Sequence, residues 1–430
     1  HRRRGGATPV SGSSRRSELD FDADRAQRSK LAASRLFCVR RSIHVPKRNP
    51  RLTQSLRDIA QRASESETPL RVSGLRGGVH AAVLAEAVRA STAPSVLVLT
   101  SGSREADRVA AQLRLLLGEQ AERSRIGVFP RHDTLPYERF SPQPFVLAQR
   151  AAGLYRWLVA ASSRSRATPV TVAPWAALAL RVPSRDRLRS HTVHLEIGQT
   201  IDRDALCERL ITSGYSRMPL VEDRGEFAVR GGILDVFPPQ HDWPLRLELL
   251  GDELESIRSF DAASQRSQQT LSHAALPPPR ELLFDRETVL EHADAIRDLA
   301  ADTEASRSDA ESLIGGLLRG HAPPGIEALA SRLRPESETV FDYLPATTQL
   351  IAVDEDAGRA RLNEGWEDVE RDYAVAKQAG RVVAPPGELF LSPEEVLSGA
   401  SKHRRLALER IEIVDATDTA TTLPVMSTDH

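Results

Sequence analysis

The sequence predicts an α/β protein in which a parallel-sheet domain is interrupted by a small β-rich α+β domain. Over about residues 65–183, short apolar runs alternate with helical patterns, which is typical of a parallel sheet covered by helices. Residues 215–260 are instead nearly all strands and tight turns, and helical patterns return from about residue 276. A chain of 430 residues, 40% of them hydrophobic, is long enough for two to four domains.

The first α/β segment is predicted as strands and helices in alternation. The expected strands are PLRVSGL, SVLVLT, IGVFP and PVTVAP, and the expected helices are VHAAVLAEAVRA, READRVAAQLRLLL and the stretch through Leu147, Leu154 and Leu158. The strands are apolar at nearly every position. Because successive side chains of a strand point to opposite faces, such runs indicate a sheet with helices on both sides.

Two hairpins are predicted in the β-rich segment. The first bends at the Arg-Gly-Gly of residues 230–232 and ends at the prolines of FPP, residues 237–239, which cannot donate to a ladder. The second, PLRLELLGDELESIRSF, turns at Gly251-Asp252. A helix over RDALCERLITSG precedes both.

The strand before Gly251 has two different faces. Side chains alternate along a strand, so Leu245, Leu247 and Leu249 share one face while Arg246, Glu248 and Leu250 share the other. We expect the leucines in the core. The mixed face has the composition of an interaction surface as much as of a solvated one.

The remaining sequence is mostly helical. RETVLEHADAIRDLAAD and DAESLIGGLLRG have helical patterns, and ETVFDYLPATTQLIAVDEDAGRARL predicts two strands and the start of a helix. A long charged helix is expected from about Ala357 to Lys377, followed by a helix over PEEVLSGA and a strand in RRLALERIEIVD. The predicted divisions are 1–60 (a disordered basic arm), 61–190 and 276–390 (the two parts of the α/β domain), 191–275 (the β-rich domain) and 391–430 (the truncated start of a next domain, or a linker).

Composition excludes several classes of protein. No window approaches 18 uninterrupted apolar residues, so we expect no membrane span. Cys38 and Cys207 lie far apart without a metal-binding pattern, which favours a reducing, cytoplasmic location and no structural metal. Residues 1–51 hold 14 Lys and Arg against 4 Asp and Glu. Such an arm can contact nucleic acid and faintly resembles a transit peptide, but a disordered tail is the favoured interpretation.

A glycine-rich turn at residues 73–83, SGLRGGVHAAV, lies between a predicted strand and helix. Gly74, Gly77 and Gly78 stand where a phosphate-cradling loop belongs, because backbone N–H groups and a helix N-terminus converge there. A working loop needs a Lys and a Ser or Thr after the last glycine, whereas Val79 and His80 follow Gly78. The sequence therefore predicts a degenerate, inactive phosphate loop.

An acidic pair follows a later apolar strand. Asp354 and Glu355 come after the strand that ends at Val353, the position that holds Mg²⁺-binding acids in nucleotide-hydrolysing sheets. Without a lysine partner we expect solvated acids at a helix start, where the dipole favours them. The motif is therefore predicted to be inactive.

Several blocks together resemble the amino-terminal part of the bacterial transcription-repair coupling factor family (Mfd). They are DTLPYERFSP, GYSRMPLVEDRGEFAVRGGILDVFPP, LRLELLGDELESIRSFDAASQRS, PPGIEAL and FDYLPATTQLIAVDE, in the family's order, within about residues 65–400. The same blocks resemble the excision-repair protein UvrB, a true helicase. The degenerate phosphate loop and the absence of UvrB's tyrosine-rich hairpin favour the coupling factor.

The resemblance implies a role and a site. It implies a degenerate helicase-like domain interrupted by a UvrB-like interaction domain that recruits UvrA to stalled RNA polymerase in transcription-coupled repair. The family's contact residues fall by motif on Arg230, Arg246 and Leu250, the last replacing the family's Phe. The ATP-, Mg²⁺- and DNA-dependent translocase of the family lies further along the chain, so this module resembles a monomeric fragment without a cofactor. The resemblance also implies that, in full-length members of the family, a carboxy-terminal domain masks the docking face.

Other interpretations of these residues stay open at this stage. Arg230 fits a solvated residue that protects a strand edge. Arg246 fits a hairpin ion pair with Glu248 or Glu253, and Asp235 fits a solvated or turn-capping acid. The rival function is a UvrB-related, helicase-like ATPase, and a third is DNA binding by the basic arm.

Overall fold

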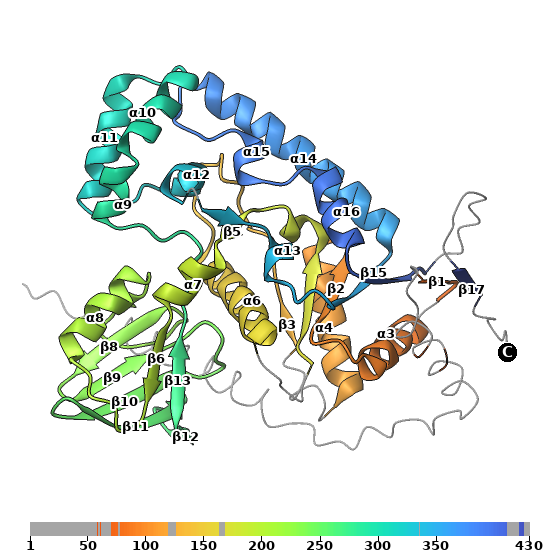
Figure 1. Cartoon of the computed structure of the whole chain (residues 1–430), viewed down its shortest axis with the longest axis horizontal. Coiled ribbons are helices and arrows are strands. Elements are labelled where there is room, and N and C mark those ends of the chain that lie inside the picture. Colours follow the sequence, from red (N-terminus) through yellow and green to blue (C-terminus); the bar gives the residue numbers. More distant parts are fainter. Residues whose placement is uncertain are drawn as a thin grey trace, which may run out of the picture. The chain divides into compact units, whose positions relative to one another are not determined.

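The structure is a computed structural model that describes residues 70–75, 78–118, 126–162, 168–334 and 336–410, the backbone of 421–424, and the single residues 58 and 61. The arm predicted for residues 1–60 lies almost wholly outside these ranges, so its disorder stays a prediction. No helix in the described ranges is both long enough and apolar enough to cross a membrane. The described elements form a large parallel sheet, a smaller β-rich domain and a helical segment (Figure 1).

A seven-stranded parallel sheet is the centre of the α/β domain. Its strand order is β17-β1-β16-β15-β2-β4-β3. The strands are β1 (Leu70–Ser73), β2 (Val96–Thr100), β3 (Gly127–Val128), β4 (Val170–Pro174), β15 (Gln349–Val353), β16 (Arg404–Leu408) and β17 (Thr421–Pro424). Strands from both ends of the described chain therefore pair side by side.

Both faces of this sheet are covered by helices, as the apolar runs predict. Val96 and Val98 of β2 pack into the same core as α3 (Gly78–Ala90) and α4 (Ser103–Leu117). Leu97 and Leu99 point the other way, into a core that includes α6 (Pro144–Ser162) and α14 (Glu355–Gln378). Alternating side chains of one strand thus serve two cores.

The end of the described chain differs from the prediction. Residues 391–430 were assigned to a next domain or a linker, but β16 lies between β1 and β15 in the sheet. Leu406 and Leu408 are fully buried there. A strand that is apolar on both faces needs a covered, central position, and this sheet supplies one.

Residues 286–343 are mostly helical, with one further difference from the prediction. FDYL, expected as a strand, forms α13 (Val340–Tyr343). Thr339 and Asp342 form a capping box at its start, in which the Thr339 N–H and hydroxyl both donate to the Asp342 carboxylate. The other helices from this segment onward are α9 (Arg286–Glu291), α10 (Ala293–Asp302), α11 (Arg307–Leu318), α12 (Ala330–Leu333), α15 (Pro386–Leu389) and α16 (Pro393–Ser401).

The β-rich domain contains a six-stranded sheet of order β12-β11-β10-β9-β8-β7. The strands are β7 (Ser216–Arg217), β8 (Glu226–Arg230), β9 (Ile233–Val236), β10 (Leu245–Leu250), β11 (Glu253–Phe260) and β12 (Ser267–Leu271). One face packs against α8 (Arg203–Thr212), which contributes Leu206, Cys207 and Leu210 to the core.

The two ends of the β-rich domain are paired with each other. β6 (Val193–Glu196) and β13 (His273–Leu276) form an antiparallel pair, with Val193 opposite Leu276. Val193, Leu195, Ala274 and Leu276 belong to the same core as the six-stranded sheet. The first and last strands of the domain therefore pair with each other and complete its core.

A buried ion pair holds the chain where it returns to the α/β domain. Glu281 accepts hydrogen bonds from Nε and Nη2 of Arg150, both 3.0 Å, and lies 3.1 Å from Nε2 of His132. Burial raises the pKa of the Glu281 carboxyl, but the charge of Arg150 and the hydrogen bond from His132 outweigh it and leave the pKa well below its usual range. The carboxylate is thus held ionised inside the protein.

Candidate functional site

The Arg-Gly-Gly turn joins β8 to β9 as a two-residue hairpin loop. Arg230 stands opposite Ile233, so only Gly231 and Gly232 lie outside the ladder. Gly231 has φ of 60°, a conformation that favours glycine. A Cβ on Gly232 would lie 2.7 Å from the Leu249 carbonyl oxygen, so this turn approaches β10 more closely than a side chain permits.

The predicted division of β10 into two faces is confirmed. Leu245 and Leu247 are fully buried, and Leu249 packs against the same core. On the opposite side, Arg246 retains 19% of its side-chain exposure and Leu250 is 70% exposed. We call this side of the six-stranded sheet, which carries Arg230, Asp235, Arg246 and Leu250, the outer face.

Asp235 is the centre of the outer face. It stands opposite Arg246 on β10 and opposite Ala228 on β8, and it is only 1% exposed. Its Oδ1 accepts from Nε of Arg246 at 2.7 Å, and its Oδ2 accepts from Nη2 of Arg246 at 2.8 Å and Nη2 of Arg230 at 3.1 Å. The expectation of a solvated or turn-capping acid was therefore wrong, because two arginines from adjacent strands cover the carboxylate.

Arg246 is held on several sides. Besides Asp235, its Nη2 donates to Oε1 of Gln265 at 2.9 Å, and its guanidinium carbon lies 4.4 Å from the centre of the Phe260 ring. The hydrogen bond to Asp235 raises the pKa of the Arg246 guanidinium. Bidentate pairing and ring stacking both fix the plane of an arginine.

The hairpin ion pair considered for Arg246 goes to another arginine. Glu248 pairs with Arg258 at 3.0 Å and accepts from the Ser256 hydroxyl at 2.6 Å. Arg258 stands opposite Arg246 in the ladder and competes for the same acid. The structure thus brings Arg230 and Arg246 together on one carboxylate, while Leu250 lies four residues further along β10, roughly 13 Å away at strand spacing.

The glycine-rich turn is described only in part. Gly74 has φ of 76° and Gly78 begins α3, whereas Gly77 lies outside the described residues. His80, in the first turn of α3, is 5% exposed. Burial, and the charges of Arg410 and Arg108, lower the pKa of His80 to about 4. A neutral imidazole thus occupies this turn at physiological pH.

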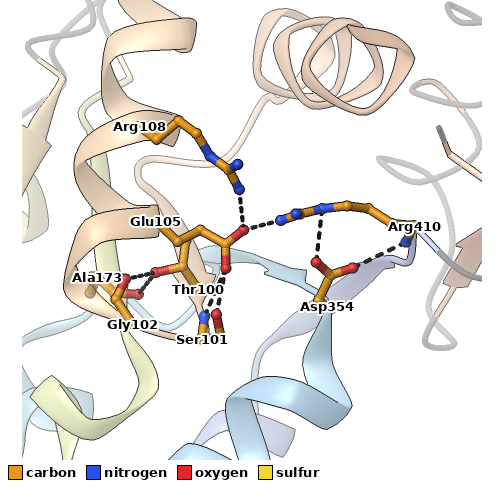
Figure 2. Close-up of polar contacts among 8 residues, drawn as sticks. All are labelled: Thr100, Ser101, Gly102, Glu105, Arg108, Ala173, Asp354 and Arg410. Carbon is orange, nitrogen blue, oxygen red and sulfur yellow. Dashed lines mark hydrogen bonds and ion pairs between the residues drawn. The ribbon is translucent and has the colours of Figure 1, made fainter. Parts of the chain in front are cut away.

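The acidic motif is occupied by arginines of the same chain. Figure 2 shows the Arg410 side chain between Asp354 and Glu105, which lie after β15 and on α4. Nε of Arg410 lies 2.9 Å from Asp354, and Arg108 bonds the same Glu105 at 2.7 Å. The carboxylate at the carboxyl end of β15 is therefore already paired.

Glu355 is not the solvated acid that the helix-start interpretation predicted. It is 3% exposed and pairs with Arg405 of the neighbouring β16. In the described ranges, no group of three His, Cys, Asp or Glu side chains is arranged to hold a metal ion. This strand end therefore contains paired charges rather than free ligands.

Comparisons with known proteins address the same regions. Residues 193–282 match the family described as the UvrB interaction domain. The chain is 34% identical over 334 residues to the transcription-repair-coupling factor of Myxococcus xanthus, covering 76% of this chain and 27% of that protein. It is 32% identical over 290 residues to that of Mycobacterium bovis (65% and 23%), and 30% over 283 residues to that of Escherichia coli (64% and 23%).

The chain spans about a quarter of the length of these relatives, as little as 23% and as much as 27%. The matched interaction domain contains the whole six-stranded sheet and its outer face. These two findings agree: the chain belongs to the transcription-repair-coupling factor family, and it contains a UvrB interaction domain.

Proposed function

We propose that this chain is an adaptor whose outer face binds UvrA in transcription-coupled nucleotide-excision repair. One observation carries the proposal: two arginines are braced on a single buried carboxylate, on the exposed side of a domain that matches the UvrB interaction domain. The outer face, with this arginine pair and the exposed Leu250, has the composition of an interface hot spot, with charged anchors and an apolar contact.

The reversal of both arginines tests the docking site. In the double variant Arg230→Glu and Arg246→Glu, we expect the affinity for purified UvrA to fall at least a hundredfold, since each hot-spot arginine contributes on the order of 2 kcal/mol. Isothermal titration calorimetry measures this directly. Arg230→Glu alone changes a half-exposed side chain, so it reports on docking even if the less exposed Arg246 position tolerates reversal poorly.

The matched control is Arg209→Glu. Arg209 is exposed on α8, which covers the opposite side of the same sheet, so this variant has the charge change of Arg230→Glu and lies in the same domain. We expect less than a twofold change in affinity. A double variant at Arg230 and Arg246 that binds UvrA as the unaltered chain does would rule out the outer face as the docking site.

We also propose that the α/β domain binds no nucleotide at its degenerate loop. The support is that Arg410 and Arg405 already neutralise the acids at the carboxyl ends of the strands. A nucleotide present at a hundred times its dissociation constant would stabilise the folded protein by about 2.7 kcal/mol. That is enough to raise the Tm by several degrees. We expect millimolar ATP with Mg²⁺ to leave the Tm unchanged, and a clear rise would favour the rival ATPase.

A further inference from the structure

We infer that Asp235 is a positioning residue for UvrA docking: it fixes the guanidinium groups of Arg246 and Arg230 before the partner arrives. The inference rests on the proposed function. It adds a residue that makes no exposed contact of its own, since Asp235 is 1% exposed. Its role would be exerted through the two arginines that it holds.

The geometry leaves the Arg246 guanidinium little freedom. Both Nε and Nη2 donate to Asp235, Nη2 also donates to Gln265, and the guanidinium carbon lies over the Phe260 ring. A long side chain normally loses rotamer freedom when a partner binds it. Here that freedom is lost on folding, so docking costs less entropy.

The donors that remain indicate what the partner must offer. Within the described residues, no hydrogen bond involves Nη1 of Arg246, or Nε and Nη1 of Arg230. Two guanidinium groups share one carboxylate, which leaves this cluster with a net positive charge. The complementary group is a carboxylate of UvrA that accepts from both arginines, with an apolar contact for Leu250 roughly 13 Å away along the strand.

The two arginines donate to the same oxygen atom, Oδ2 of Asp235. Oδ2 of Asp235 accepts from Nη2 of both Arg246 and Arg230, at 2.8 and 3.1 Å. The Arg230 side chain is 52% exposed and makes no other side-chain hydrogen bond within the described part of the chain. Without the carboxylate, Arg230 would have nothing to direct it toward Arg246. The two arginines should therefore contribute to binding as a coupled pair.

The test is Asp235→Asn, which keeps the size of the side chain but removes the charge and one acceptor. We expect the affinity for UvrA to fall at least tenfold by calorimetry. In the unaltered chain Arg230→Ala should cost at least tenfold, and in the Asp235→Asn background less than threefold. A merely structural role would not produce this coupling, because independent effects multiply.

A spectroscopic signature accompanies the binding assay. In the free chain, the Nε–Hε group of Arg246 should give a sharp NMR resonance with slow hydrogen exchange, because Asp235 accepts from it. That resonance should broaden or exchange rapidly in Asp235→Asn. If this variant unfolds, Gln265→Asn provides a second test. Asn is too short to reach Arg246 and tolerates the φ of 58° at this position, and we expect at least a threefold loss of affinity.

The control is Glu208→Gln, an acid-to-amide change at an exposed residue of α8, which covers the opposite side of the same sheet. We expect less than a twofold change. The inference is overturned if Asp235→Asn binds within twofold of the unaltered chain, or if its effect and that of Arg230→Ala simply multiply. If the unaltered chain does not bind UvrA, the proposed function fails as well, so the two failures are distinguishable.

Discussion

At the scale of single residues, several buried acids are paired with arginines from other elements of the fold. Asp235 takes its arginines from two adjacent strands, and Asp354 takes Arg410 from 56 residues away. Glu105 pairs with the same Arg410 from a separation of 305 residues. These charged residues, which interrupt apolar runs in the sequence, are therefore paired with each other within the chain.

Glu409 is a buried acid with a weaker set of partners. It is 4% exposed, and its side chain accepts one hydrogen bond, from the backbone N–H of Glu355 at 3.2 Å. Burial raises the pKa of the Glu409 carboxyl to about 7; the Glu355 N–H and Arg71 oppose this shift, and Asp356 and Asp354 add to it. At neutral pH this carboxyl therefore titrates inside the folded protein.

The sign of the pH dependence follows from that raised pKa. Between about pH 4.5 and pH 7 the folded chain keeps a proton that the unfolded chain has released, so the free energy of unfolding falls as pH rises through this window. We expect Glu409→Gln, which keeps an acceptor for the Glu355 N–H, to be more stable than the unaltered chain by on the order of 2 kcal/mol at pH 8.

Below pH 4.5 the two proteins should be equally stable, because Glu409 is then protonated in both states of the unaltered chain. Urea unfolding at pH 4.5, 6 and 8 measures the difference. A difference that stays constant over this range would show that the Glu409 carboxyl does not titrate inside the protein.

At the scale of elements, side-chain alternation predicted the two faces of β10. Because the period of a strand is fixed, Leu245 and Leu247 could be assigned to the core and Arg246 and Leu250 to the other face from the sequence alone. The two-residue turns at Gly231 and Gly251 were predictable for a different reason. Glycine permits the positive φ that such turns require.

What the sequence did not show was the register between separate hairpins. Asp235 on β9 and Arg246 on β10 are joined through the loop at residues 237–244, and nothing local fixes which residues stand opposite each other. The pairing of Asp235 with both arginines was therefore missed, although Arg230 and Asp235 flank the same turn. The α13 helix was missed differently: Thr339 and Asp342 are a capping signal that the apolar pattern of FDYL concealed.

At the scale of the whole molecule, the α/β sheet is assembled from segments on either side of the inserted domain. β15 and β16 follow the insertion, yet they lie between β1 and β2, which precede it. This order of strands needs contacts across most of the chain, and no local pattern in the sequence specifies it. The placement of residues 404–408 inside the sheet was unpredictable for that reason.

Removing β16 should destabilise the α/β domain and leave the β-rich domain stable. In a chain shortened to end at residue 402, β1 and β15 lose the strand between them, so we expect rapid hydrogen exchange in β2 and β15. β9 and β10 should stay protected, because they have a core of their own. Hydrogen exchange with mass spectrometry resolves both regions.

The control for this truncation is a chain that ends at residue 410, which keeps β16 and Arg410. Its β15 should exchange slowly. Equal protection of β15 in the two truncated chains would mean that β16 contributes little to the stability of the sheet.

The pairing of β6 with β13 has a consequence for how such a domain can be moved between proteins. It brings the first and last strands of the β-rich domain side by side, at a strand spacing of about 5 Å. A host chain therefore needs only a surface loop whose ends are about that far apart to receive the whole domain as a cassette. Grafted in this way, the outer face would bring its arginines already fixed, and the UvrA binding proposed for it would be portable.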